Sequence, residues 1–531
     1  MKLFILSLFF PLTLYSQTDS CDILIKNGKI IDGTGNSWYY GDLAVKNGKI
    51  LQIARRIDRP AKKIIDAAGL IVAPGFIDVH THLEGDETKD PNATNFILDG
   101  VTTCITGNCG SSNIEIGKYL EFIDSLKLSI NVATLIGHND VREKVMGRAN
   151  REATPEEMQE MKGIVDKAMR EGAVGFSTGL IYIPGTYTKT PEIVELAKVA
   201  AKYNGVYATH MRNEGDSVTQ AIDEALTVAR EARIPVEISH FKLSGQQNWG
   251  RSKETVPMIA AARKEGIDVT IDQYPYTASS TTISTLIPDE ILAGTQDSIN
   301  ARLQNPQTKK YVVGYMLKKL AKRKLKHFSY AVVAYCEADT TYNGKSVEEI
   351  NLMKGRKHTA ASEAETVIDI VMHGGASAIF HGMSEEDIKR IMKYPYDMFA
   401  CDASIRQFGV GVPHPRGYGT NARVLAEYVR EQHVISLEEA IRRMTSLPAQ
   451  KFQLHDRGLL AEGYAADIII FDENKVQDLS TYQHPHAYSR GFRFVIVNGK
   501  LTVENEKHLG IRAGRALYGP AFQNNSSLSV H

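Results

Sequence analysis

The chain of 531 residues has no net charge and, beyond its N-terminus, no long apolar run. Lys and Arg total 62, and Asp and Glu also total 62. Surfaces that bind nucleic acid or anionic membranes usually carry a clear excess of positive charge, so neither is expected as the main partner. After the N-terminal segment, no stretch reaches 18 consecutive apolar residues, and we expect no membrane span in the mature chain.

Cysteines are also few, and their number is odd. The chain has five: Cys21, Cys104, Cys109, Cys336 and Cys401. Their spacings match no small disulfide framework and no zinc-knuckle pattern. An exported protein with unpaired cysteines either buries them or gives one to a metal.

The N-terminus has the features of a secretory signal peptide. Lys2 precedes the apolar segment LFILSLFFPLTLYS, which ends at the small residue Ser16 before a polar stretch. We therefore predict a signal peptide over residues 1–16 and an exported protein, periplasmic or secreted; a buried first strand or helix is the alternative. Cys21 follows Thr-Asp-Ser, a poor match to a lipoprotein cleavage site, so lipid anchoring is not expected.

Two segments at opposite ends of the chain resemble each other. Residues 22–72 and 451–520 both contain alternating apolar residues around Asn-Gly-Lys, and Asn-Gly is typical of hairpin turns. The length of the chain also exceeds what one core usually supports. These features predict a small β-sandwich domain built from both termini, with hairpins at the Asn-Gly pairs.

Between these segments, residues 73–450 alternate between short apolar runs and amphipathic stretches. Eight runs are strand candidates: GFIDVHTH, VTTCITGNCG, INVATLIGHND, AVGFSTGL, GVYATHMRNE, VEISHFK, DVTIDQYPY and DMFACDAS. Stretches such as 154–172 open with Thr-Pro and end near Gly, as helices do. Eight strands alternating with helices predict an α/β fold of the (β/α)8 TIM-barrel type. The interval 282–375 is too long for one crossover and predicts an inserted lid or subdomain between strands 7 and 8.

The ends of these strands carry metal-binding residue types. They are His80, His82, Cys109, His210, His240 and Asp402. One histidine in an apolar strand is usually a core residue, but six such groups at the C-terminal ends of barrel strands would meet at one rim. Imidazole and thiolate ligands suit zinc. By strand position Asp402 is the candidate to move a water proton; capping of the next loop is the alternative.

These residues lie in motifs that resemble a known family. PGFIDVHTHLEGD resembles the first-strand signature of the amidohydrolase superfamily. GVTTCITGNCGSS, YATHMRNEGDS, EISHFK and HPRGYGT resemble the D-aminoacylase (N-acyl-D-amino-acid deacylase) family. The resemblance runs from about Asp22 to Asn498 and implies a barrel flanked by a small β-domain.

The resemblance also implies roles for individual residues. Cys109, His210 and His240 would hold one zinc tightly. His80 and His82 with Asp402 would form a second, weaker position or line a mononuclear site. The fourth strand ends in STGLIY, without the lysine that bridges two metals in most amidohydrolases, which fits the cysteine-bridged branch.

The substrate contacts are implied in the same way. Lys242 and Arg416 would pair with the substrate α-carboxylate, Arg416 through a two-pronged contact. Both could instead be rim residues exposed to solvent. Tyr182 and Tyr274 would help to orient the substrate.

The chain departs from the family pattern at the eighth strand. FACDAS keeps Asp402 but has Cys401 and Ala403 where the family usually has a Gly-Ser-Asp-Gly turn, and Phe241 stands where a second histidine is common. The insert at 282–375 matches the family least, so side-chain selectivity is expected there.

The resulting hypothesis is a zinc-dependent hydrolase of a small-molecule substrate, which releases a carboxylate and a free D-amino acid from N-acyl-D-amino acids. One alternative is an exported dipeptidase acting on L-Xaa-D-Xaa dipeptides with the same centre. A cyclic-amide hydrolase is disfavoured by the missing lysine. A non-catalytic binding protein for D-amino acids or acyl amino acids is supported only by the altered turn at FACDAS.

Overall fold

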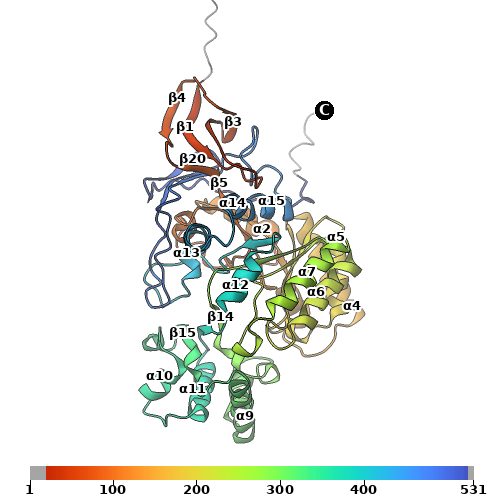
Figure 1. The fold of residues 1–531 in the computed structure, drawn as a ribbon. Helices are drawn as coiled ribbons and strands as arrows, with labels where there is room; N and C mark the ends of the chain where they lie inside the picture. The colour runs from red at the N-terminus through yellow and green to blue at the C-terminus, as the bar shows by residue number, and fades with distance from the viewer. Residues whose placement is uncertain (1–19, 524–531) are drawn as a thin grey trace, which may run out of the picture.

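The computed structural model describes residues 20–523, so the predicted signal peptide lies outside the described residues. Within that range no helix is both long and apolar enough to cross a bilayer. Figure 1 shows three parts: a sheet made from both ends of the chain at one end, a central barrel, and a helical insert at the other end.

The central part is a barrel of eight parallel strands. In chain order its strands are β6 (Phe76–Asp78), β7 (Val101–Thr106), β8 (Asn131–Thr134) with β9 (Ile136–Gly137), β10 (Gly175–Gly179), β11 (Val206–His210), β12 (Val236–Ile238), β13 (Val269–Gln273) and β17 (Asp397–Phe399). Six pair in the order β17-β13-β12-β11-β10-β9, and three in the order β6-β7-β8. β8 and β9 are two pieces of one strand, and a parallel bridge between Thr81 and Ala403 joins the first strand to the last. All eight predicted strands are present, and the (β/α)8 prediction is confirmed.

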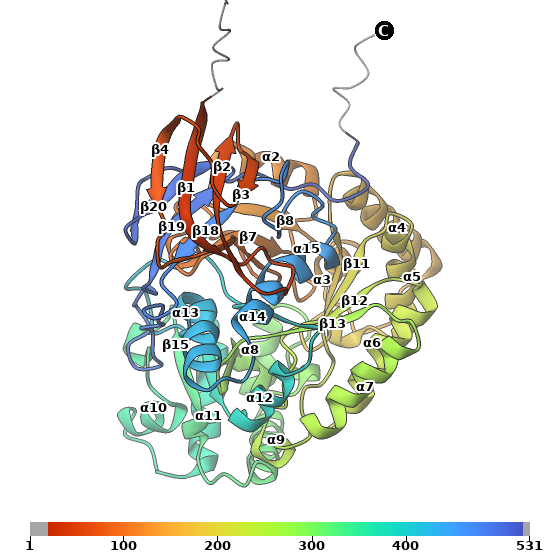
Figure 2. The same ribbon diagram turned by 45° about the horizontal axis from the view of Figure 1, so that its top comes forward.

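Helices surround the barrel, as Figure 2 shows for α4 to α7 beside β11, β12 and β13. They include α2 (Ile116–Leu126), α3 (His138–Met146), α4 (Pro155–Arg170), α5 (Thr190–Ala201), α6 (Val218–Ala232), α7 (Ser252–Lys264), α12 (Glu385–Met392), α13 (Arg416–Arg423), α14 (Leu437–Met444) and α15 (Ser446–Lys451). The Thr-Pro pair that predicts a helix start is found at the beginning of α4. Thr154 accepts a hydrogen bond from the Glu157 N–H, and the Glu157 side chain accepts one from the Thr154 N–H. This reciprocal cap satisfies two amide groups that a helix start leaves unpaired.

The two ends of the chain form one nine-stranded sheet, here called the terminal sheet. Its strands are β1 (Cys21–Ile30), β2 (Tyr39–Lys46), β3 (Lys49–Ala54), β4 (Ala61–Asp66), β5 (Ile71–Pro74), β18 (Ile468–Phe471), β19 (Phe492–Val497), β20 (Lys500–Glu504) and β21 (Lys507–His508). The two halves join where β5 pairs antiparallel with β18.

One predicted hairpin of this sheet is wrong. Asn47-Gly48 turns between β2 and β3, and Asn498-Gly499 turns between β19 and β20, as expected. Asn27-Gly28 instead lies inside β1, where the pairing with β2 shifts register. Asn27 has φ 61°, and a Cβ on Gly28 would lie 2.5 Å from Val72. The pair therefore forms a bulge that lets β1 pass close to β5.

The insert is a subdomain with its own sheet and core. It contains β14 (Ala278–Thr282), β15 (Ala331–Tyr335) and β16 (Ser377–His381), paired in the order β14-β16-β15. Its helices are α8 (Gln296–Gln304), α9 (Pro306–Lys322), α10 (Val347–Met353) and α11 (Ala360–Met372). The strands that lead out of and back into the barrel pair with each other, so the insert extends slightly beyond the predicted 282–375.

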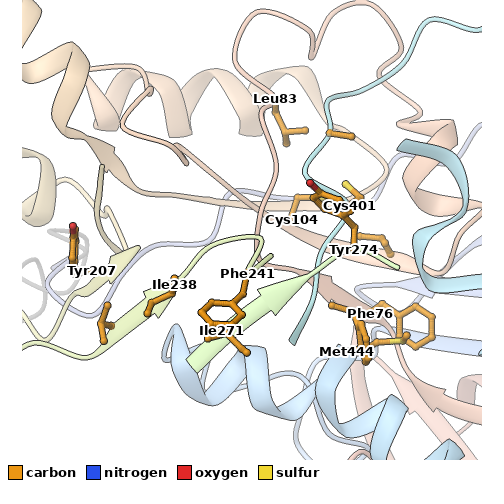
Figure 3. Close-up of a cluster of buried hydrophobic side chains, with 14 of the residues drawn as sticks. Phe76, Leu83, Cys104, Tyr207, Ile238, Phe241, Ile271, Tyr274, Cys401 and Met444 are labelled. Atoms are coloured by element: carbon orange, nitrogen blue, oxygen red, sulfur yellow. The ribbon is translucent and has the colours of Figure 1, made fainter. Parts of the chain in front are cut away.

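A continuous apolar core fills the space between the barrel strands and their helices. Figure 3 shows part of it, with Phe241 close to Ile271. Phe241, at the position where a histidine is common in the family, is 1% exposed and belongs to this core. The substitution therefore adds packing behind the neighbouring His240 and leaves that histidine facing the rim.

Candidate metal centre

The six predicted ligands all lie at the C-terminal ends of barrel strands. His80 and His82 follow β6, Cys109 follows β7, His210 is the last residue of β11, His240 follows β12, and Asp402 follows β17. We call these six residues the ligand cluster. All are buried except His82, whose side chain is 35% exposed.

Three members of the cluster have strained backbones. Cys109, His240 and Asp402 have φ of 54°, 37° and 49°, in the left-handed region that residues with a Cβ rarely adopt. Such conformations cost about 1–3 kcal/mol each and persist where the surroundings enforce them. Here they turn the chain sharply after the strand, so that the side chains point across the rim.

The turn at Cys109 also depends on a glycine of another strand. A Cβ on Gly179, at the end of β10, would lie 1.9 Å from the Cys109 carbonyl oxygen. No side chain fits there unless the backbone moves. The glycine therefore lets the loop of Cys109 lie against the fourth strand.

Cys109 is at the centre of the cluster. Its Sγ lies 3.3 Å from His80 Nε2, 3.6 Å from His210 Nδ1 and 3.7 Å from His240 Nε2. Around a tetrahedral zinc, with Zn–S about 2.3 Å and Zn–N about 2.0 Å, sulfur and nitrogen ligands lie about 3.5 Å apart. The donor set and its spacing therefore fit zinc.

A second group shares one histidine with the first. Asp402 Oδ1 lies 3.2 Å from His82 Nε2 and 3.6 Å from His80 Nε2. His80 Nε2 thus faces both Cys109 and Asp402. The family resemblance implied two sets of three, one around Cys109 and one around Asp402. The structure places His80 between the two sets.

The electrostatics of the cluster favour a cation. Burial lowers the pKa of His210 and of His240 well below the ordinary value, with neighbouring positive groups adding to the effect, so both rings are neutral and offer a lone pair. Burial, followed by the nearby Asp402, raises the pKa of the Cys109 thiol well above its ordinary value. A thiolate at this position requires a bound cation.

Glu214, which the sequence reasoning missed, supports the cluster from behind. Its Oε1 lies 2.9 Å from His240 Nδ1, 4.0 Å from His210 Nε2 and 2.5 Å from Lys242 Nζ. Carboxylates that contact the outer nitrogen of a ligand histidine orient the ring and raise its basicity. No spacing rule singles it out in the sequence, because it lies in the loop after β11.

Asp272 in β13 is a second missed carboxylate. Its Oδ1 accepts a hydrogen bond of 2.9 Å from the His240 N–H, and its Oδ2 lies 3.7 Å from His80 Nδ1. It is fully buried. It therefore fixes the strained turn at His240 and faces the outer nitrogen of His80.

The two predicted carboxylate-binding residues are buried and already paired. Arg416 Nη1 lies 2.9 Å from Asp402 Oδ2, and Arg416 Nη2 donates to the Ser280 carbonyl at 3.3 Å. Lys242 donates to Glu214 and to the His240 carbonyl. With 4% of each residue exposed, the alternative of solvent-exposed rim residues is wrong.

The two predicted tyrosines lie near these cations. The Tyr274 ring centroid is 4.5 Å from the Arg416 guanidinium carbon and 5.6 Å from Lys242 Nζ, and within residues 20–523 its buried hydroxyl has no hydrogen-bond partner. The Tyr182 ring lies 5.0 Å from the His210 ring, and its hydroxyl is 3.0 Å from Thr281 Oγ1 in the insert. The structure thus brings all ten predicted site residues into one region.

A cavity of about 270 Å³ adjoins this region. Glu214 and Thr281 contribute to its lining, so it lies between the ligand cluster and the insert. Four cationic residues also line it: Arg212, Lys319, Lys322 and Arg323. Arg212 pairs with Glu224 and Lys322 with Asp216, whereas Lys319 and Arg323 have no carboxylate partner among the described residues.

Known proteins resemble this chain along nearly its whole length. A profile of the amidohydrolase family matches residues 63–503. D-aminoacylase of Alcaligenes xylosoxydans xylosoxydans is 33% identical, over 94% of this chain and 99% of that protein. N-acyl-D-aspartate deacylase of the same organism is 34% identical, over 95% of this chain and 96% of that protein.

Solved structures agree with these relatives. A crystal structure of D-aminoacylase superposes with a TM-score of 0.80 at 33% identity, covering 94% of this chain and all of that one. N-acyl-D-glutamate deacylase from Bordetella bronchiseptica, complexed with zinc and a phosphonate mimic of the tetrahedral intermediate, gives a TM-score of 0.80 at 32% identity with the same coverage. A D-hydantoinase, at 16% identity and a TM-score of 0.56, shares the fold alone.

Proposed function

Because the chain belongs to the amidohydrolase family, in its D-aminoacylase branch, we propose that it is a zinc-dependent hydrolase of N-acyl-D-amino acids. The products are a carboxylate and a free D-amino acid. The observation that carries the proposal is the Cys109-centred ligand cluster facing Asp402, with Arg416 and Lys242 beside it.

Cys109, His210 and His240 would hold the zinc, with His80, His82 and Asp402 next to it. Bound zinc would polarise the scissile carbonyl and would lower the pKa of a bound water toward about 7. Asp402 accepts the proton of the attacking water and passes it to the departing nitrogen. Its Oδ1 faces the two histidines and its Oδ2 faces Arg416, so one carboxylate touches both sides of the site.

Arg416 is the main candidate for the substrate carboxylate. A guanidinium has five N–H donors, and Arg416 directs only two of its nitrogens at Asp402 and Ser280. The remaining N–H groups of the guanidinium can donate to a substrate carboxylate. Lys242 contributes positive charge, and the unpartnered Tyr274 hydroxyl is available to donate to the substrate.

The cavity beside Glu214 supports substrates that carry a further negative charge. Lys319 and Arg323 approach it from the insert without carboxylate partners among the described residues. Two relatives are named for the deacylation of N-acyl-D-aspartate and N-acyl-D-glutamate. We therefore expect faster turnover of acidic than of apolar N-acyl-D-amino acids.

A substrate panel on the zinc-reconstituted protein tests the proposal. It contains N-acetyl-D-glutamate, N-acetyl-D-leucine, their L-enantiomers, an L-Xaa-D-Xaa dipeptide and a hydantoin. We expect hydrolysis of both N-acetyl-D-amino acids and none of the L-enantiomers. Faster cleavage of the dipeptide would instead support the dipeptidase hypothesis.

Replacing Asp402 tests the proposed proton transfer. General acid–base groups contribute about 10²–10⁴-fold to rate, so Asp402→Asn should lower kcat by that factor. Asp223→Asn, at an exposed position of α6, is the matched control. If Asp402→Asn stayed within a few-fold of the wild type, the assignment would fail.

We also propose that the protein is exported, which is supported by the N-terminal sequence alone. N-terminal sequencing of the protein from fractionated cells should find a start close after Ser16. Cys21 is fully buried in β1 of the terminal sheet, with its Sγ 3.5 Å from the Pro60 carbonyl, and a lipid on that sulfur would require the strand to move.

A further inference from the structure

We propose that the insert holds a second metal site, separate from the ligand cluster, for a divalent ion of the zinc type. Its residues are His327, Glu348, His358 and Glu363, here called the insert cluster. Each offers a ligand atom, and these four atoms lie within 4.8 Å of one another.

The four side chains come from three segments of the insert. His327 directly precedes the short turn Phe328–Tyr330. Glu348 lies in the first turn of α10. His358 and Glu363 lie on either side of the start of α11. Figure 1 shows α10 and α11 next to each other at the end of the molecule opposite the terminal sheet. A metal ion here would tie the starts of both helices to the segment that leads into β15.

The charges of the cluster call for a cation. The Glu363 side chain is fully buried and that of Glu348 is 22% exposed. Among residues 20–523, their only ion-pair partners are His327 and His358. A buried carboxylate is costly unless a cation balances it. One divalent ion would balance the charge of both carboxylates.

The ligand atoms already face one another. His327 Nδ1 lies 2.6 Å from Glu363 Oε1 and 3.7 Å from Glu348 Oε1, and His358 Nε2 lies 2.6 Å from Glu348 Oε1. Nitrogen and oxygen ligands of a tetrahedral zinc are about 3.3 Å apart. The two short contacts would therefore lengthen by less than about 1 Å, which a change in side-chain torsion provides.

The two rings lie side by side. The imidazoles stack with their centroids 4.3 Å apart and an interplanar angle of 25°. Each ring directs one nitrogen at a carboxylate of the cluster, so one ion placed among these atoms could be shared by both histidines and both glutamates.

The cluster is accessible, and its position links it to the catalytic side of the insert. The His358 side chain is 51% exposed and that of His327 is 30% exposed, so an ion can enter and water can complete its coordination. Strand β14 of the same subdomain carries Thr281, whose hydroxyl contacts Tyr182. We infer that the metal has a structural role, holding the insert in the shape that forms one wall of the cavity.

Zinc counting on the full-length protein tests the inference. The experiment compares the wild type with His358→Ala and His373→Ala. Each protein is equilibrated with buffered Zn²⁺, and weakly bound metal is removed. Mass spectrometry then gives the zinc bound per chain. We expect His358→Ala to hold one zinc fewer than wild type. His373, an exposed insert histidine that contacts a backbone carbonyl, is the control and should leave the count unchanged.

Two further variants separate this site from the ligand cluster. Cys109→Ala should lose zinc from the centre and keep the zinc of the insert cluster. Glu348→Gln should lower the zinc bound per chain as His358→Ala does. If His358→Ala has a lower melting temperature than the wild type, Glu348→Gln serves as the test in its place. An unchanged count in both His358→Ala and Glu348→Gln, with circular dichroism showing folded protein, would overturn the second site whatever the substrate panel shows.

Discussion

Asp402 and Arg416 form a buried ion pair, with Asp402 Oδ2 2.9 Å from Arg416 Nη1, while the other oxygen of Asp402 faces His80 and His82. Burial alone would raise the pKa of Asp402, but Arg416, followed by the histidines, holds it well below the ordinary value. The carboxylate is therefore ionised throughout the neutral range.

Removing Arg416 should affect both stability and substrate binding. Breaking a buried ion pair from one side costs about 3–5 kcal/mol of unfolding free energy, so Arg416→Ala should lower stability by that amount in denaturant unfolding. Its KM should rise at least tenfold. Arg416→Lys keeps the charge but loses the planar guanidinium group. Its unfolding free energy should therefore be closer to the wild-type value than its KM is. Arg423→Lys, on the same helix and paired with Asp478, is the control and should leave KM unchanged.

Glu214 should act as a positioning residue for the metal ligands. Glu214→Gln removes the charge facing His240 Nδ1 and Lys242, and losses of such supporting groups typically weaken metal binding 10–100-fold. Competition with a chelator should show this loss of zinc affinity in the absence of substrate. Glu231→Gln, at an exposed position, is the control. An unchanged zinc affinity would mean that Glu214 only neutralises Lys242.

Zinc affinity should rise with pH with a slope close to one. The raised pKa of Cys109 means that the thiol is protonated between pH 6 and 8, so a zinc that binds at the ligand cluster must displace one proton. The lowered pKa values of His210 and His240 mean that these rings are already neutral and release none. Affinity should thus increase about tenfold per pH unit in chelator competition. A slope near zero would show that the thiolate exists before metal binds, and a slope near three that the histidines are protonated.

Gly179 should be intolerant of a side chain. Gly179→Ala places a methyl group against the Cys109 carbonyl oxygen and must push the Cys109 loop away from the other ligands. We expect loss of activity and of the zinc of the ligand cluster, but not of the zinc of the insert cluster, in a protein that still folds; metal content and circular dichroism measure this. Gly163→Ala, inside α4 with open space around its Cβ position, is the matched control. It should stabilise the protein by up to about 1 kcal/mol through helix propensity.

The sequence predicted the barrel, and the gathering of the six residues of the ligand cluster at one rim, because both follow one regular pattern. Short apolar strands are easy to recognise, and a metal ligand just after such a strand must lie on the C-terminal rim. Position directly after a strand does not identify residues whose partners are determined by tertiary contacts. Glu214 and Asp272 are ordinary acidic residues in the sequence, and only the folded rim shows that they contact the ligand histidines.

Three more features of the structure were not predicted from the sequence, and each has its own local cause. Asn27-Gly28 has the residues of a hairpin turn, but close passage of β1 against Val72 makes it a bulge. The pairing of Arg416 with Asp402 joins a helix start to a strand end, which no spacing in the sequence reveals. The insert cluster draws on residues up to 36 positions apart with no motif, as the contact between His327 and Glu363 shows.

The pairing of β5 with β18 has a consequence for how the chain reaches its final form. These partners are separated by the whole barrel and the insert, so the terminal sheet stays open until almost all of the protein has been synthesised. Contacts so distant in sequence close slowly because chain entropy must be lost first. Until then the edge of β5 that receives β18 is exposed to pairing with other chains. A product truncated before β18 would keep that exposed edge permanently and should be prone to aggregate.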